Sequence, residues 1–485
     1  MYDKWAERPF FGRRQVLEAL GAHLDAVRRT GSGRMLAIRG RRQVGKSSAV
    51  ERFASQSGVP AVFTTAVFGA SASQHLADAS DALAQAGDLL PEAELLAQSA
   101  ASSWRDWLGR IALAARTGPV IAVLDEFPWL AAAAPALEGE LQVQWDRTLE
   151  RLPVLLILVG SDVGMMDRLA AHDRPLFGRL HPMAIPALNP AEVAEALPGA
   201  TAQEVFDAYL VTGGYPRLVA DLAAARTTAA AFARTAMSDP FSPLVATAQL
   251  SLQAEFAGGP VAGQVLSAIG GSEIGRAAFS EVMAAIADPA DPARTQTAVT
   301  RALKTLTGAK ELIRMEQPAW AAPTSKLRRY RVTDPYLRFW FRYVQRHLDQ
   351  IARGRPDLAV AAFDRDWPSW RGVSVEPVVR SAFDRLALTD PALAGVEAVG
   401  SWWVRDGSVE VDVIASTDSA TALVGTVKWR SKGGVSQRDL AALAAARARV
   451  PRAGAARLAA ISPSGAAPAG FDLSYSAADL LTAWP

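Results

Sequence analysis

The strongest constraint on this chain is a glycine-rich segment near its start, Gly40-Arg41-Arg42-Gln43-Val44-Gly45-Lys46-Ser47-Ser48. Two glycines separated by four residues, followed by lysine and serine, let backbone amides wrap around a triphosphate. We expect Lys46 to reach the β and γ phosphates and Ser47 to offer its hydroxyl to Mg²⁺. The apolar run Met35–Ile38 precedes the segment and a helical pattern follows it, so a buried strand leads into the positive end of a helix. The segment therefore predicts binding of ATP or GTP.

A second apolar run, Val120–Leu124, ends in two carboxylates and reads as a Walker B strand. Such a run is typical of a strand buried on both faces of a parallel sheet, and ligands bind beyond the carboxyl ends of these strands. Both acids are thus expected beside the phosphates. Asp125 would hold Mg²⁺, directly or through water, and Glu126 would polarise the attacking water as general base.

The length and composition of the chain limit the number of domains and exclude some classes of site. With 485 residues, half of them hydrophobic, the chain is long enough for two to four domains. It has no cysteine, which excludes disulfides and thiolate metal sites and fits a reducing cytoplasm. The start lacks a basic region followed by an apolar core, and no apolar run approaches the roughly 18 residues of a membrane span, so we expect no signal peptide and no membrane partner. A net charge of +2 does not by itself argue for nucleic acid.

The first part of the chain predicts an α/β class, with a parallel sheet covered by helices. Residues 1–190 form the expected P-loop ATPase core, and residues 191–240 a helical lid that includes Ala202–Val211. The proline-containing segment Ser238–Pro243 reads as a linker. The expected strands of the core are Met35–Ile38, Ala61–Thr65, Val120–Leu124 and Val154–Val159. Besides the helix that follows the glycine-rich segment, a helix is expected at Leu141–Leu152.

Residues 255–333 have the order of a winged helix-turn-helix. The pattern predicts helices and then a two-stranded wing, at Val261–Ile269, Arg276–Ile286, Thr297–Leu306, Glu311–Met315 and Tyr330–Val332. One interpretation places Thr297–Lys304 in a DNA major groove. The other is a protein-docking module, which winged helices also form.

Residues 334–485 predict a further small α/β domain. Its expected elements are helix Val375–Leu386, strands Val399–Val404, Ser408–Ala415 and Thr421–Trp429, and helix Leu440–Ala446. Basic residues gather at Lys326–Arg331 and recur at Arg338, Arg342 and Arg346. They fit contact with a phosphate backbone, or alternatively a solvated face or pairing with acids elsewhere.

Several shorter motifs accompany these segments: Phe11–Arg13, Leu124–Phe127, Gly160-Ser161, Arg174–Arg179, Gly213–Arg217 and Val332–Phe341. Together they resemble archaeal-type P-loop ATPases, a family also found in bacteria and related to AAA+ and STAND proteins. The resemblance implies ATP rather than GTP, and a C-terminal domain similar to restriction endonucleases. It implies that Ser161 is a sensor of the γ phosphate, or else a strand-ending turn. It also implies that Pro216 places the lid against the nucleotide, and that Arg217 is a weaker candidate for a nucleotide sensor.

The same resemblance offers Arg179 as a cationic finger toward a neighbouring subunit's nucleotide, or as a structural arginine. The finger role would require a homo-oligomer.

In the C-terminal domain the resemblance implies a nuclease-type site of Glu376, Asp412 and Lys428. Thr426 stands where the acid of an acid-x-Lys pair is expected, and a neutral oxygen cannot replace that charge for a hard cation. Glu410, two residues from Asp412 on the same strand face, is a substitute. A degenerate DNA- or protein-binding remnant is therefore favoured over active cleavage.

The sequence as a whole favours an ATP-binding, ATP-hydrolysing switch that uses Mg²⁺ and is coupled to a DNA- or protein-binding C-terminal region. The alternatives are an ATP-sensing DNA-binding regulator with little turnover and a nucleotide-coupled nuclease. Steady ATP turnover separates the first from the second, and metal-dependent nicking of DNA identifies the third.

Overall fold

The computed structural model describes residues 9–86, 100–256, 260–272, 275–286, 291–430 and 433–484. The stretch 1–8, where no signal peptide is expected, lies outside them. The chain divides into two compact units, Met1–Ala187 and Leu188–Pro485. The first boundary falls close to the expected end of the core at residue 190.

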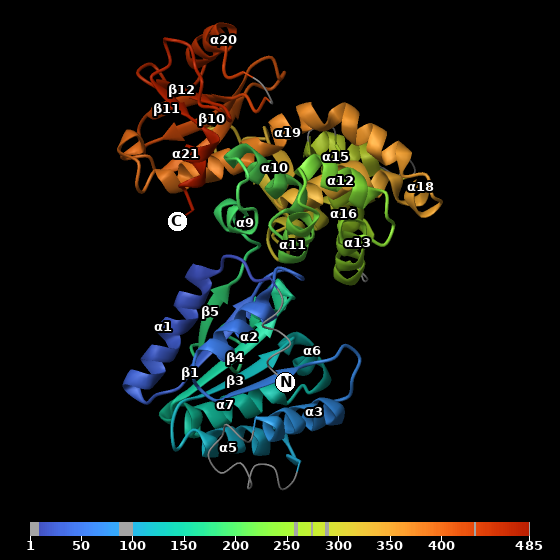
Figure 1. Ribbon diagram of the computed structural model, residues 1–485, viewed down its shortest axis with the longest axis vertical. Helices are drawn as coiled ribbons and strands as arrows, with labels where there is room; N and C mark the ends of the chain where they lie inside the picture. Colours follow the sequence, from blue (N-terminus) through green and yellow to red (C-terminus); the bar gives the residue numbers. More distant parts are fainter. Residues whose placement is uncertain are drawn as a thin grey trace. The chain divides into compact units, whose positions relative to one another are not determined.

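The first unit is built on a five-stranded parallel sheet in the order β2-β3-β4-β1-β5, which confirms the expected α/β core (Figure 1). Its strands are β1 Arg34–Arg39, β2 Ala61–Thr65, β3 Val120–Asp125, β4 Val154–Gly160 and β5 Leu180–Ala184. Its helices are α1 Arg14–Thr30, α2 Lys46–Gln56, α3 Ala72–Gln85, α5 Trp104–Ala114, α6 Phe127–Ala133, α7 Leu137–Arg147 and α8 Val163–Leu169. The helix expected at Leu141–Leu152 starts earlier and ends at Arg147, before a short 3-10 turn, Leu149–Arg151.

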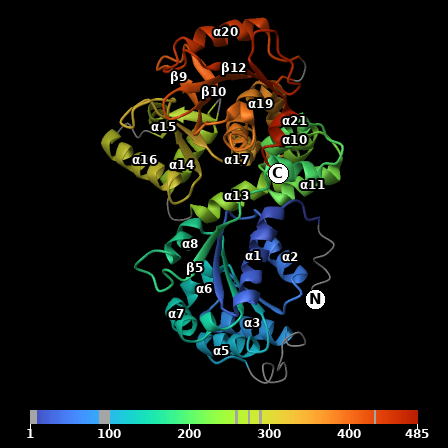
Figure 2. The same ribbon diagram turned by 90° about the vertical axis from the view of Figure 1, so that its left-hand side faces the viewer.

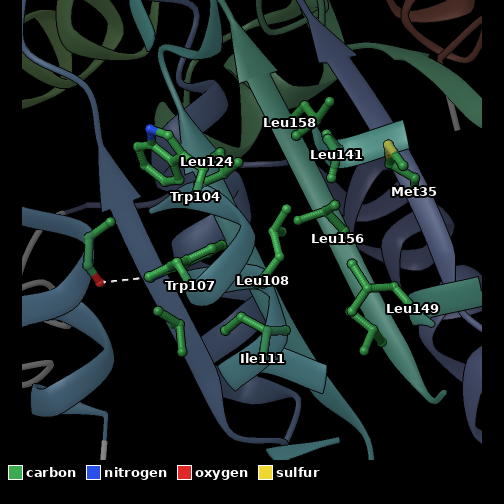
Figure 3. Close-up of a cluster of buried hydrophobic side chains, with 14 of the residues drawn as sticks. Met35, Trp104, Trp107, Leu108, Ile111, Leu124, Leu141, Leu149, Leu156 and Leu158 are labelled. Carbon is green, nitrogen blue, oxygen red and sulfur yellow. Dashed lines mark hydrogen bonds between the residues drawn. The ribbon is translucent and has the colours of Figure 1, made fainter. Parts of the chain in front are cut away.

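Alternate residues of the central strands face opposite layers of helices. Leu36 and Ile38 of β1 pack with α1 and α2, whereas Met35 and Ala37 pack with α3, α5 and α7. Figure 3 shows the second layer, in which the indole Nε1 of Trp107 donates a 2.9 Å hydrogen bond to the carbonyl oxygen of Ala79. Because both faces are covered, β3 and β4 are buried along their whole length.

The second unit begins with four short helices and a break before the next helix. The helices are α9 Pro190–Ala196, α10 Ala202–Thr212, α11 Pro216–Ala225, α12 Ala229–Met237 and, after the break, α13 Pro243–Glu255. The break at residues 238–242 lies at the expected linker.

A small module of helices and an antiparallel sheet follows. Its elements are α14 Pro260–Gly270, β6 Arg276–Ala278, α15 Phe279–Ile286, α16 Pro292–Thr307, β7 Ile313–Glu316 and β8 Arg329–Val332. The sheet has the order β6-β8-β7. The helix predicted for Arg276–Ile286 is wrong at its start, because Arg276–Ala278 pairs with Arg329–Arg331 of β8 as a strand.

The C-terminal part carries a mixed sheet in the order β13-β12-β11-β10-β9. The elements leading to it are α17 Pro335–Phe339, η4 Trp340–Val344, η5 Gln345–His347, α18 Leu348–Ala352, α19 Asp357–Leu386 and the 3-10 turn η6 Pro391–Leu393. The sheet and its later helices are β9 Ala398–Trp403, β10 Glu410–Ser416, β11 Thr421–Val427, α20 Gln437–Arg447, β12 Arg457–Ile461, β13 Leu473–Tyr475 and α21 Ala477–Leu481. In Figure 2, α19 and α20 lie on opposite sides of this sheet. Strands β12 and β13 were not expected.

Among the described residues, no helix is both long and apolar enough to cross a membrane.

Candidate functional site

The glycine-rich loop joins β1 to α2 and is fixed by tight backbone packing. A Cβ at Gly40 would lie 2.3 Å from the carbonyl oxygen of Ile185, so a larger residue would displace the loop. Gly45, with φ of 87°, turns the chain into α2 through the left-handed region that glycine adopts at little cost.

Arg13 holds the same loop from the N-terminal side. Its side chain is buried and donates hydrogen bonds to the carbonyl oxygens of Val44 and Pro186. The sequence placed Arg13 in a motif without giving it a role. The only signal available was an arginine beside Gly12, which does not reveal the carbonyl groups that it binds.

The loop and the Walker B strand meet through one hydrogen bond. Ser47 Oγ donates to Asp125 Oδ2 at 2.8 Å, and the second carboxylate oxygen of Asp125 accepts the backbone N–H of Glu126 at 3.0 Å. The two predicted metal-binding residues are therefore in direct contact, although 78 positions separate them.

Lys46 is buried in the loop and its Nζ donates to the carbonyl oxygen of Arg41 at 2.9 Å. Burial lowers the pKa of Lys46 to about 8, although the carboxylates of Glu126 and Asp125 oppose the shift. Burial likewise raises the pKa of Asp125. Both shifts mean that a charged group is held out of water without a full set of counter-charges.

Glu126 extends from the end of β3 toward the end of β4. Its backbone lies in the left-handed region with φ of 51°, and its carboxylate accepts the hydroxyl of Ser161 at 2.7 and 3.0 Å. A non-glycine residue in this conformation is uncommon and is often found at functional sites. The structure thus joins the predicted general base to the predicted γ-phosphate sensor.

This arrangement fits a magnesium nucleotide by the chemistry of its donors. The hydroxyl of Ser47 and the carboxylate of Asp125 are hard oxygen ligands of the kind that Mg²⁺ takes. The loop backbone and the N-terminus of α2 offer N–H groups to phosphate oxygens. Arg42 stacks over the ring of Trp129, its guanidinium carbon 5.3 Å from the ring centroid, while Gln43 and Ser48 are exposed.

Arg179 forms an ion pair within its own unit. Its Nε and Nη2 lie 2.6 and 2.7 Å from the two carboxylate oxygens of Asp146, and its side chain keeps 26% of its exposure. The neighbouring Arg174 pairs with Glu138 of the same helix, α7. The sequence did not indicate Asp146 as a partner. In this conformation Arg179 has the contacts of a structural arginine, and its finger role stays a prediction.

Pro216 belongs to the second unit, where it begins α11, so its contact with nucleotide also stays a prediction. The glycines before it are packed against neighbouring backbone and side chains. A Cβ at Gly214 would come within 1.9 Å of the carbonyl oxygen of Leu188, and one at Gly213 would meet Tyr336 at 2.7 Å. Tyr215 donates its hydroxyl to Asp334 at 2.7 Å. The motifs Gly213–Arg217 and Val332–Phe341 therefore pack directly on each other.

The predicted nuclease-type residues are close together but are bound to other protein groups. Arg276 Nη1 lies 2.7 Å from Glu410 and 3.9 Å from Glu376. Asp412 accepts the hydroxyl of Thr426 at 3.1 Å, and Lys428 lies 4.0 Å from Asp439 of α20. Burial, followed by the nearby Asp412, raises the pKa of Glu376 to about 8.

The basic run does not form a continuous exposed stripe. Arg329 and Arg331 pair with Glu410 and Glu316. Arg338 is buried, Arg342 pairs with Asp366, and Arg346 donates to the carbonyl oxygen of Gly271. The interpretation as a phosphate-binding stripe is wrong for these residues. Arg329, Arg331 and Arg342 pair with acids, as the alternative predicted, whereas Arg338 and Arg346 donate to backbone carbonyl oxygens.

Comparison with known proteins identifies two domain families. Residues 9–157 match the AAA ATPase domain, and residues 340–442 match DUF234, described as archaeal and bacterial proteins of unknown function. An uncharacterised protein of Methanocaldococcus jannaschii, MJECL04, is 25% identical over 313 residues, which cover 64% of this chain and 67% of that protein. The resemblance to archaeal-type P-loop ATPases is thereby confirmed.

Two solved structures are similar at low identity. The Walker-type ATPase PABY2304 of Pyrococcus abyssi is 16% identical with a TM-score of 0.49, covering 70% of this chain and 99% of that one. The ORC2 protein of Aeropyrum pernix, solved as ADPNP-ADP complexes, is 14% identical with a TM-score of 0.43, covering 74% and 98%.

The lowered pKa of Lys46 predicts a pH dependence of stability. Its ordinary pKa is 10.5, so between about pH 8 and 10.5 the unfolded chain binds more protons at this residue than the folded chain. Stability should therefore rise with pH across this window, by about 3 kcal/mol in total. We expect Lys46→Met to lose this rise. Chemical denaturation of the nucleotide-free wild type and variant at several pH values measures the free energy of unfolding of each. If the free energies of both proteins change with pH in the same way, the buried environment assigned to Lys46 is wrong.

Proposed function

We propose that this chain, in which an AAA ATPase domain precedes a DUF234 domain, binds and hydrolyses ATP and acts as a nucleotide-dependent switch. The observation that carries the proposal is the hydrogen bond from Ser47 to Asp125. It brings the phosphate loop and the acidic end of a buried strand to one point, where a magnesium nucleotide needs both.

Each residue then has a distinct part. The amides of residues 40–48, which include Arg41, Arg42, Gln43 and Val44, surround the phosphates, and Lys46 contacts the β and γ phosphates. Ser47 and Asp125 would hold Mg²⁺, which when bound neutralises charge on the phosphate oxygens. Glu126 orients and deprotonates the attacking water, and Ser161 fixes the carboxylate of Glu126 for that step.

Replacing the two principal residues should separate binding from hydrolysis. Lys46→Ala removes the cation that contacts the phosphates and should abolish ATP binding. Glu126→Gln keeps the shape but removes the base, so ATP should still bind while kcat falls about 100-fold or more. Asp81→Asn, an exposed acid on α3, is the control and should change neither. Equilibrium binding and phosphate release measure the two effects, and an unaltered rate in Glu126→Gln would remove its role.

The finger role of Arg179 can be tested against its ion pair with Asp146. If Arg179 reaches a neighbouring subunit's nucleotide, Arg179→Ala should lower turnover about 1000-fold, and turnover per subunit should rise with protein concentration. Asp146→Asn breaks the same ion pair but leaves the arginine, so we expect it to retain turnover. Equal effects of the two variants on stability, without a specific loss of turnover in Arg179→Ala, would indicate a structural arginine.

We further propose that the module of residues 255–333 is a winged helix whose helix α16 contacts DNA. The support is one face of α16 on which Thr297, Thr300, Arg301 and Lys304 are all exposed. The sequence of α16 contains no acidic residue. A basic helix face of this kind fits a phosphate backbone and a major groove.

Charge reversal at Arg301 and Lys304 should weaken DNA binding, and the slope of log K against log salt should become shallower by about 2. The control, Arg353→Glu with Arg438→Glu, changes the net charge equally at exposed arginines outside α16. Fluorescence anisotropy with duplex DNA at several salt concentrations measures both slopes. Identical slopes in the two variants, or binding that salt leaves unchanged, would point to a protein partner.

A further inference from the structure

The sheet β6-β8-β7 is docked on the acidic cluster of the C-terminal part through arginines. Arg276 of β6 and Arg329 of β8 both bind Glu410 Oε1, at 2.7 and 3.2 Å. Arg276 also lies 3.9 Å from Glu376 of α19. The side chains of Arg276 and Glu376 each keep only 11% of their exposure, so these charges are largely removed from water and depend on one another.

A second pair of charges extends the cluster. Arg331 of β8 donates to Glu316 of β7 at 2.8 Å, and Arg380 of α19 lies 3.7 Å from the carboxylates of both Glu316 and Glu376. Arg380 also donates to the backbone carbonyl of Asp412 at 2.9 Å. Positive and negative groups thus alternate from the small sheet to β10.

Two uncharged hydrogen bonds join the segment between β7 and β8 to the same domain, and Arg329 of β8 adds a cation–π contact. The backbone N–H of Ala319 donates to the carbonyl oxygen of Ser401 at 2.9 Å, and the indole of Trp320 donates to the hydroxyl of Thr421 at 2.8 Å. The guanidinium of Arg329 lies 4.5 Å from the centroid of the Trp403 ring. These bonds to β9 and β11 fix the orientation of the segment between β7 and β8 independently of the ion pairs.

Asp412 is satisfied by donors rather than by a cation. It accepts the hydroxyl of Thr426 at 3.1 Å and the backbone N–H of Val427 at 2.8 Å. An acid at position 426 would repel Asp412, whereas the hydroxyl binds it. Within the described ranges, no cluster of three or more acids or histidines is arranged to hold a metal ion.

We propose that Glu376 and Glu410, which lie beside Asp412, form an intramolecular docking site for the sheet β6-β8-β7. The guanidinium groups of Arg276, Arg329 and Arg380 supply the positive charge that a divalent cation would supply in a nuclease. While the sheet is docked, its arginines exclude metal from the acids, and these acids serve to join two modules.

Hydrogen exchange of the full chain tests the docking. In Arg276→Gln/Arg329→Gln, Glu410 loses both arginine partners and Glu376 keeps only Arg380, so we expect amides of β6 and β8 to exchange at least about tenfold faster. Strands of the first unit should be unchanged. The matched control is Arg294→Gln/Arg314→Gln, which removes two exposed arginines of the same module and should leave exchange as in the wild type. Unchanged exchange in the first variant, or an equal increase in the control, would overturn the proposal.

Titration of the wild-type chain with Mn²⁺ in the absence of nucleotide tests the exclusion of metal, even if the double variant unfolds the second unit. We expect no binding that depends on Asp412 up to millimolar Mn²⁺. The Asp125→Asn variant reports Mn²⁺ binding without the site in the first unit. Mn²⁺ binding in that variant that is lost when Asp412→Asn is added would overturn the exclusion of metal.

Discussion

The hydrogen bond between Ser47 and Asp125 depends on strand order more than on any local feature. Strands β3, β4 and β1 are neighbours, and Arg39 at the end of β1 lies in register with Gly160 at the end of β4. The loop after β1, the acids after β3 and Ser161 after β4 therefore emerge at one edge of the sheet. Because β3 and β4 are buried on both faces, they cannot shift without disturbing two layers of helices. The core thus holds the site rigid.

Charge burial within that site has a direct energetic consequence. Lys46 and Asp125 are both nearly inaccessible to water, and burial lowers the pKa of the lysine while raising that of the acid. A triphosphate offers negative oxygens to the lysine, so its binding would compensate part of a cost already present in the folded chain. Burial of Lys46 and Asp125 therefore destabilises the nucleotide-free core and at the same time favours nucleotide binding. This is a common relation between stability and function.

Much of the core could be predicted because its signals are local. The apolar runs gave β2 at its observed bounds and β1, β3 and β4 within a residue or two, and the loop and acids lay where those runs end. Strand β5 was missed because it contains His181 and Pro182 and is largely exposed at the sheet edge, so it lacks an apolar pattern. Ion-pair partners were beyond the reach of a pattern, since Asp146 and Arg179 are 33 positions apart and meet only through the fold.

The basic residues of Lys326–Arg331, with Arg338, Arg342 and Arg346, also show that a sequence pattern does not reveal ion-pair partners. Basic residues close in sequence indicate a positively charged surface only if no acid faces them in the fold. Here Glu410 of β10 faces Arg329 and Glu376 of α19 faces Arg276, and both acids lie far along the chain. A guanidinium and a divalent cation satisfy carboxylates in different ways: the cation needs several acids at one point, whereas each arginine needs only one or two. A threonine rather than an acid at position 426 avoids repulsion with Asp412 in a site filled by arginines, whereas an acid there would strengthen a site filled by metal. Thr426 and the paired arginines therefore fit the proposed docking role better than they fit a metal site.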